Sequence, residues 1–127
     1  MLFRYFLKLL LCCGLLPAYS QSDFKNSKDS LAFEKADLAF NLASRNSDSA
    51  MLLARGAYEA ALTIKNDRTI GNALNAMGWT MMHKGDLDSS IMLLEKSRKH
   101  FSSYGNLDDI VRVSINIAEA YTKPLMI

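Results

Sequence analysis

The residues with most capacity for chemistry are two histidines, and two aspartates that follow a glycine. His83 and His100 lack the i,i+4 spacing by which one helix presents two imidazoles to a zinc ion. Asp86 and Asp88 follow Gly85 as in a calcium loop, but the spaced acids and closing glutamate of an EF-hand are missing. We interpret both aspartates as helix caps. No nucleophile or phosphate motif is present, so the sequence predicts no enzyme, metal or cofactor.

The cysteines lie in an N-terminal segment that predicts a secretory signal peptide over residues 1–20. MLFRYFLK carries two cations and no acid, LLLCCGLL is apolar, and AYS supplies small residues before Gln21. The apolar run is shorter than the roughly 20 residues that cross a bilayer. The alternative is a short membrane-associated or core helix, retained as an anchor. Cleavage would remove Cys12 and Cys13, and the mature chain would lie in the bacterial periplasm or cell envelope.

Charge gives no sign of a nucleic-acid partner. The whole chain has 15 basic and 13 acidic residues. Two of the basic residues, Arg4 and Lys8, belong to the predicted signal peptide, which contains no acid. The remaining chain is therefore balanced, and its net charge does not suggest the basic surface on which nucleic-acid binding depends.

The rest of the sequence predicts an all-α domain. Residues 21–29 are polar and are interpreted as a linker, and residues 30–127 form the predicted helical domain. Proline is absent between Pro17 and Pro124, which permits long helices. Gly85 and Gly105 are expected to end two of them. The five predicted helices span 30–45, 48–65 (capped by Ser47 or Asp48), 67–84 (capped by Asp67), 87–103 (capped by Asp86 or Asp88) and 107–123.

The helices repeat with a period of 40 residues, which makes about two and a half helical hairpins. The first helix fits this period with a loop one residue shorter, which places Ala39 over Gly78. Small residues recur where neighbouring helices would meet. The matched pairs are Ile70 with Ile110, Met77 with Ile117, Gly78 with Ala118, Ala50 with Ser90, Leu53 with Leu93, and Ala57 with Ser97.

This pattern resembles the tetratricopeptide repeat, in its longer-looped variant common in bacterial envelope and signalling proteins. The resemblance implies a right-handed α-solenoid in which small residues pack the hairpins. The usual proline after the second helix is missing, and Ser102 stands about there. The resemblance to the tetratricopeptide repeat rests on Leu74, Met77, Gly78, Met81, Gly85, Leu87, Ser90, Leu94 and Ser97. The expected packing positions are Ala39, Gly78, Ala118, Ala50, Ala57, Ser90, Leu94 and Ser97.

The resemblance also implies a concave groove that binds a partner. Gly78 is expected to face Leu94 and Ser90, which turns Trp79 by about 100° toward the groove. Phe40 would be its neighbour, and such aromatics are typical anchors for a peptide or helix. The alternative is that the two rings simply pack on each other. The expected groove residues are Phe33, Phe40, Asn72, Asn75, Trp79, Met82, His83, Arg112, Ile115 and Glu119.

The expected function is therefore an exported, non-catalytic module for binding a protein or peptide. The alternative is a sensory or scaffold segment of a longer signalling protein, such as a histidine kinase or transcription regulator. The last helix is expected to leave an uncovered stripe, Ile117, Ala118 and Tyr121, through which the chain would continue or self-associate. Folding back of residues 125–127 onto Tyr121 is the alternative.

Overall fold

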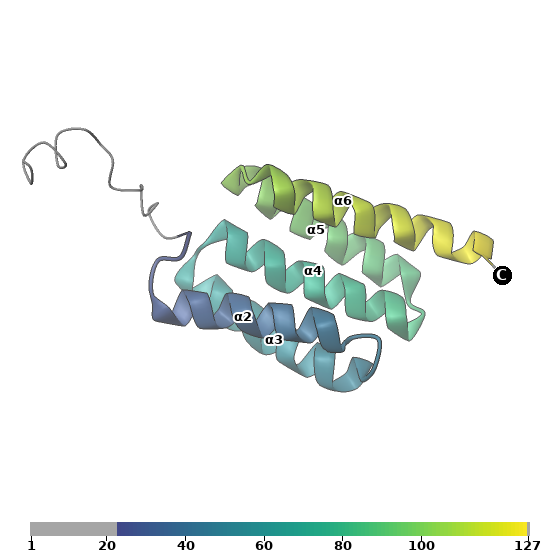
Figure 1. The fold of residues 1–127 in the computed structure, drawn as a ribbon, viewed down its shortest axis with the longest axis horizontal. Coiled ribbons are helices and arrows are strands. Elements are labelled where there is room, and N and C mark those ends of the chain that lie inside the picture. Colours follow the sequence, from purple (N-terminus) through teal and green to yellow (C-terminus); the bar gives the residue numbers. More distant parts are fainter. Residues whose placement is uncertain (1–22, 127) are drawn as a thin grey trace, which may run out of the picture.

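The computed structural model describes residues 23–126, in which five α-helices are followed by a short 3₁₀ turn (Figure 1). The predicted signal peptide, 1–20, lies outside the described residues. No helix of the described part combines the length and hydropathy of a bilayer span. The elements are α2 (Ser27–Leu42), α3 (Ser47–Ile64), α4 (Asp67–Lys84), α5 (Leu87–Tyr104), α6 (Leu107–Thr122) and η1 (Lys123–Met126).

Each of the five described α-helices begins with an N-cap whose side-chain oxygen accepts a hydrogen bond from a backbone N–H two or three residues later. The capping residues recur every 20 positions: Asn26, Asn46, Asn66, Asp86 and Asn106.

This regularity corrects three expectations. Asn46 and Asn66, rather than Ser47 or Asp48 and Asp67, cap α3 and α4. The first helix starts at Ser27 instead of residue 30, because Asn26 caps it and Asp29 is buried, so residues 27–29 are not linker. The helices start at residues 27, 47, 67, 87 and 107, so the first hairpin has the same 40-residue period as the others and not a period shortened by one residue.

The C-terminal ends of three helices also recur every 20 residues, in the left-handed conformation. Gly85 and Gly105 adopt it with φ of 87° and 91°, as expected for glycines that end helices. Lys65 occupies the same place after α3 with φ of 62°. Its carbonyl accepts a hydrogen bond from Lys25 Nζ at 2.9 Å, which ties the N-terminal segment to this turn.

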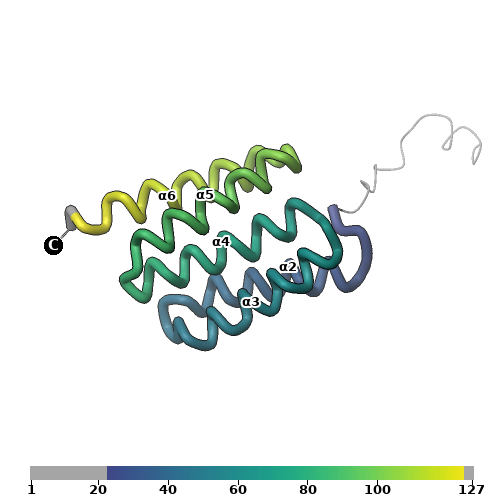
Figure 2. The backbone as a smooth tube through the Cα atoms, turned by 180° about the vertical axis from the view of Figure 1, so that it is seen from behind, coloured from purple at the N-terminus to yellow at the C-terminus, as the bar shows by residue number. Residues whose placement is uncertain are grey.

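The helices form hairpins arranged around α4 (Figures 1 and 2). Helix α4 packs against all four others, whereas α3 and α5 do not contact each other. Contacts between α2 and α4, and between α4 and α6, place these three helices side by side. The face that they share is the one on which the sequence predicts the groove.

The two halves of the array have different cores. The first is built from fully or almost fully buried alanines of α2, α3 and α4: Ala36, Ala39, Ala54, Ala57, Ala73 and Ala76. Because alanine is small, these helix backbones approach closely. The second core joins larger side chains of α4, α5 and α6: Met82, Leu94, Phe101, Val113, Ile117 and Ala120.

Helices α4 and α5 approach most closely at two glycines of α4. A Cβ on Gly78 would lie 2.7 Å from Leu94 Cγ, and Ser90 Oγ donates to the Gly78 carbonyl at 2.7 Å. Two turns earlier, a Cβ on Gly71 would lie 2.7 Å from Phe101 Cδ1. There Ser97 Oγ donates to the Gly71 carbonyl at 2.6 Å. The arrangement expected around Gly78 is thus present, and the equivalent contact at Gly71 was not predicted from the sequence.

Of the expected packing positions on helices other than α4, all but Ala118 are buried. Ala39, Ala50, Ala57, Ser90, Leu94 and Ser97 are fully buried. Ala118 is exposed, because no described helix covers the side of α6 that corresponds to the side of α4 covered by α5.

Candidate binding groove

An aromatic cluster joins α2 to the C-terminal half of α4. The Phe40 and Trp79 rings stack with centroids 4.9 Å apart and planes 18° apart. The edge of His83 meets Trp79 at 5.1 Å. Phe40 and Trp79 are half-buried and His83 is exposed. The two rings therefore pack on each other, as the alternative interpretation expected, and both keep accessible surface.

The last turn of α6 lies close enough to influence this cluster. The pKa of His83 is lowered, chiefly by partial burial and then by the charge of Lys123, while Glu119 acts in the opposite direction. Both Glu119 and Lys123 are exposed. The cluster thus has an anionic and a cationic side chain in its surroundings.

Three expected groove residues are buried instead of lining an open groove. Asn72 is 2% exposed because it bridges neighbouring helices. Its Nδ2 donates to Asp37 Oδ1 at 2.8 Å and to the Phe33 carbonyl at 3.2 Å, and its Oδ1 accepts from Arg112 at 3.3 Å. Met82 is fully buried in the second core.

Asn75, the third, pairs with α6. Its Oδ1 accepts from Asn116 Nδ2 at 2.9 Å. The Nδ2 atom of Asn75 has no hydrogen-bond partner. Within residues 23–126 it is the one buried side-chain nitrogen or oxygen without such a partner. Asn72 and Asn75 therefore fasten α4 to its neighbours and are not free to meet a ligand.

The remaining expected groove residues stay at the surface to different degrees. Phe33 is half-buried beneath the guanidinium of Arg68, at 4.8 Å from its ring centroid. Arg112 is half-buried, whereas Ile115 and Glu119 are exposed. The more open part of the surface thus lies at the C-terminal half of α4, beside Phe40 of α2, and along α6.

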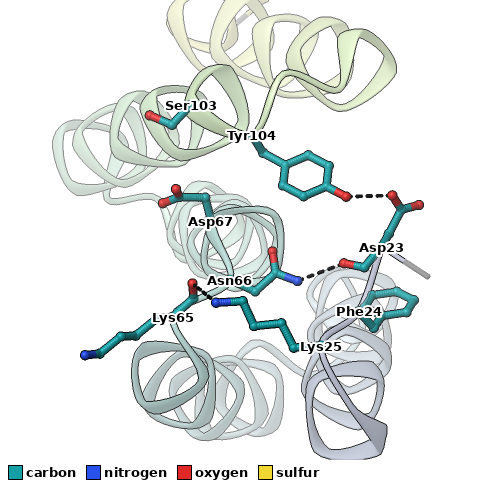
Figure 3. Close-up of a pocket in the computed structure, with 8 residues that line it drawn as sticks. All are labelled: Asp23, Phe24, Lys25, Lys65, Asn66, Asp67, Ser103 and Tyr104. Carbon is teal, nitrogen blue, oxygen red and sulfur yellow. Dashed lines mark hydrogen bonds between the residues drawn. The ribbon is translucent and has the colours of Figure 1, made fainter. Parts of the chain in front are cut away.

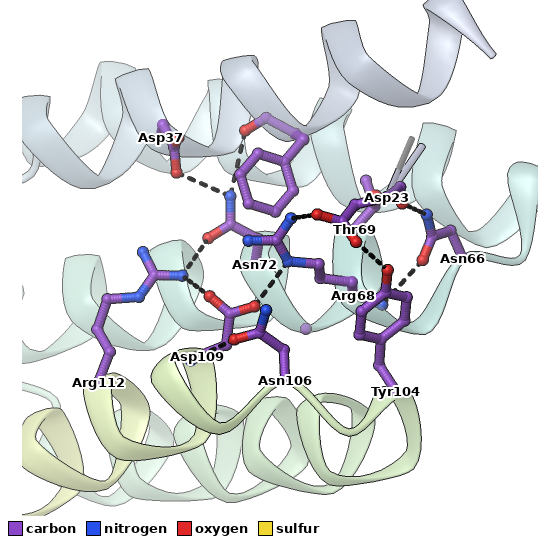
Figure 4. A network of polar contacts seen from close by, with 12 residues as sticks. Asp23, Asp37, Asn66, Arg68, Thr69, Asn72, Tyr104, Asn106, Asp109 and Arg112 are labelled. Atoms are coloured by element: carbon purple, nitrogen blue, oxygen red, sulfur yellow. Dashed lines mark hydrogen bonds and ion pairs between the residues drawn. The ribbon is translucent and has the colours of Figure 1, made fainter. Parts of the chain in front are cut away.

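A continuous polar network occupies the opposite end of this face (Figure 4). Arg68 donates to Asp109 at 2.7 Å and to Asp23 at 3.1 Å. Arg112 reaches the other oxygen of Asp109 at 3.0 Å. Partial burial acts to lower the pKa of Arg68, but Asp109 and Asp23 outweigh it and the pKa is raised. The network holds the two arginines in place between α2, α4 and α6.

The buried carboxylate of Asp29 forms a second polar centre. It accepts from Thr69 Oγ1 at 2.5 Å, Asn66 Nδ2 at 2.6 Å and the Lys25 backbone N–H at 2.7 Å. Neither polar centre was predicted from the sequence. The available signal was positional, since Asp29, Thr69 and Asp109 recur every 40 residues, three positions after a helix cap.

An open cavity of about 500 Å³ lies where the N-terminal segment meets the ends of α3 and α5 (Figure 3). Tyr104 donates to Asp23 at 2.6 Å, and this bond is the main reason that the pKa of Tyr104 is raised. The cavity carries both cations and acids, so charge favours no ligand class. Its lining residues are Asp23, Phe24, Lys25, Lys65, Asn66, Asp67, Ser103 and Tyr104.

Asp86 and His100 have structural partners, whereas Asp88 lies in the first turn of α5 and, against expectation, is not its cap. Asp86 accepts from the backbone N–H and the hydroxyl of Ser89, which lowers its pKa and caps α5. His100 pairs with Asp67 at 2.7 Å. Within residues 23–126, no three His, Cys, Asp or Glu side chains gather as a metal site would require.

Comparisons with known proteins identify no related protein or structure. A scan against protein-family models gives no match, and searches of the curated proteins and of the solved structures give no significant match.

Proposed function

We propose that this chain is a non-catalytic module of the tetratricopeptide-repeat type, exported from the cytoplasm, that holds a protein or peptide on the face shared by α2, α4 and α6. Support comes from the helical hairpins, the 40-residue period and the small residues at helix contacts. The proposal places the ligand at the C-terminal half of α4, since the polar network fills the other end.

The stacked pair of Phe40 and Trp79 carries this proposal. Partly exposed aromatic rings that are fixed by stacking offer large contact area at little entropic cost, as binding anchors do. A ligand of matching chemistry would place an apolar or aromatic side chain against the rings.

Tryptophan fluorescence provides a direct test, because Trp79 is the only tryptophan in the chain. Peptides would be selected on residues 21–127 from a phage-displayed random library and titrated while the indole emission is followed. We expect saturable changes, with affinity falling at least ten-fold in Phe40→Ala. Leu52→Ala is the control, since Leu52 is an exposed side chain of α3.

Two outcomes would contradict the proposed site. Selection of no peptide that alters Trp79 emission would remove its support. Equal affinities of Phe40→Ala and the unmodified chain would place binding on another surface.

Export is tested separately by mass spectrometry of the protein from a bacterial host. We expect a mature chain that starts at Gln21 in the periplasmic fraction. An intact segment 1–20 on soluble cytoplasmic protein would contradict it.

A further inference from the structure

The outward face of α6 is apolar, and no other helix of residues 23–126 covers it. Leu107, Val111 and Ile115 are 71%, 49% and 61% exposed, and Ala118 is exposed beside them. Their spacing of three and four residues places them on one helix face. A groove of about 320 Å³ runs along α6 beside this face, between Leu107, Val111 and Ile115 and the polar Arg112 and Asn116.

The position of the uncovered stripe differs from the sequence expectation. Ile117 is only 7% exposed because it packs in the second core. Tyr121 is 59% exposed and lies at the edge of the outward face. Leu107, Val111 and Ile115 therefore replace Ile117 as the centre of the uncovered surface.

The repeat indicates what kind of element fits this surface. Val111 and Ala118 stand 40 residues after Gly71 and Gly78, the positions of α4 that receive Phe101 and Leu94 of α5. Helix α5 runs antiparallel to α4 (Figure 2). The corresponding face of α6 is therefore oriented to receive another antiparallel helix.

The charges beside the apolar face select the partner. Asp108, Arg112, Glu119 and Lys123 follow one flank of the helix and its continuation into η1, with signs that alternate along the chain. In an antiparallel pair of identical helices, each flank meets its own copy in reverse order. Asp108 then lies near Lys123 of the second copy, and Arg112 near its Glu119. All four charges are matched.

We propose that two copies of this chain associate through α6, antiparallel, about a two-fold axis near Ile115. The apolar side chains provide the affinity, while the exposed charge pairs fix direction and register. Asp109 and Asn72 hold the guanidinium of Arg112 in place, while 38% of its side chain stays exposed and accessible to Glu119 of a second copy. A two-fold interface is closed, so association stops at the dimer.

Sedimentation equilibrium of residues 21–127, which contain every described contact, tests the proposal. We expect a monomer–dimer equilibrium at micromolar concentrations. Ile115→Lys should weaken dimerisation at least ten-fold. Lys123→Glu should weaken it at least five-fold, since Asp108 would then face a glutamate, and Asp108→Lys combined with Lys123→Glu should restore it to within two-fold. Lys99→Glu on α5 is the control for net charge.

Each alternative result overturns the pairing. If the chain stays monomeric at high micromolar concentration, the outward face of α6 does not bind a second copy and is available to a different protein. A dimer that tolerates Ile115→Lys uses another surface. Failure of the charge-reversed double variant to restore association excludes the antiparallel register. Growth beyond the dimer indicates head-to-tail assembly, and circular dichroism of each variant establishes that its helices are intact.

Discussion

At the scale of single residues, two glycines set the separation of α4 and α5. Glycine inside a helix costs about 1 kcal/mol relative to alanine, yet α4 contains two of them, Gly71 and Gly78. Each allows a large side chain of α5 to lie against the α4 backbone, and each carbonyl accepts from a serine hydroxyl. The loss in helix propensity is offset by this packing.

Substituting alanine at Gly78 and at Gly56 should have opposite effects on stability. Gly78→Ala should lower the free energy of unfolding by about 1–3 kcal/mol through overpacking, because the added Cβ meets Leu94 at both its side chain and its backbone. Gly56 lies inside α3 with only the flexible Lys35 side chain near its Cβ position, at 3.8 Å. Gly56→Ala should therefore stabilise by about 0.5–1 kcal/mol. Urea unfolding of both variants measures the two free energies. If Gly78→Ala stabilises the fold, α5 must move away from the added Cβ at little cost.

Tyr104 gives a prediction for alkaline pH. Its pKa is raised above the ordinary value of 10.0, mainly by the hydrogen bond to Asp23. A tyrosine whose folded pKa is raised stabilises the fold fully below its unfolded pKa and loses that contribution as pH rises through the folded pKa. The melting temperature should thus fall above pH 10, with a smaller fall in Tyr104→Phe. Identical pH profiles for the two proteins would show that this bond does not stabilise the N-terminal segment.

At the scale of elements, the five described helices all begin with a side-chain N-cap, but the capping residues differ in their surroundings. Asn46 caps α3 at an exposed position through a single bond to the Ser49 N–H. Asn66 caps α4 while buried, and its Nδ2 also donates to Asp29 and to the Asp23 carbonyl. The same residue type therefore carries one structural task in α3 and three in α4.

Replacing each cap by alanine should separate these tasks. Asn46→Ala should cost about 1 kcal/mol, as for an ordinary N-cap. Asn66→Ala should cost about 1–3 kcal/mol more, because the buried carboxylate of Asp29 would lose a donor. Urea unfolding of the matched pair gives both values. Equal losses would show that Asp29 finds a replacement donor such as water.

These elements also show what the sequence could predict. Helix number, the hairpin period and the turn glycines follow from local patterns, so Gly85 and Gly105 were identifiable in advance. The burial of Asn72 was not, because it depends on Asp37 and Arg112 of two other helices, and the rotation of one helix against another is not encoded locally. The exposure of Ala118 likewise depends on whether a further helix covers α6.

At the scale of the whole molecule, stability should vary with the number of neighbours that each helix has. Helix α4 contacts all four other described helices, whereas α6 packs mainly on α5, and within residues 23–126 no helix covers its outward face. In repeat arrays each unit is stabilised by its immediate neighbours, and terminal units open first.

Native-state hydrogen exchange should therefore be slowest in α4 and faster in α6. The measurement should use Ile115→Lys, in which the proposed dimer contact is removed, so that exchange reports the single chain. We expect central amides of α4 to be protected at least about ten-fold more than those of α6, a difference of about 1.4 kcal/mol in opening free energy. Protection should be intermediate in α2, whose alanine contacts cover one side while Leu31 and Leu38 remain exposed. If all five helices exchange at one rate, the molecule opens as a single cooperative unit, and the contacts of α4 with both hairpins bind the terminal helix as tightly as the central one.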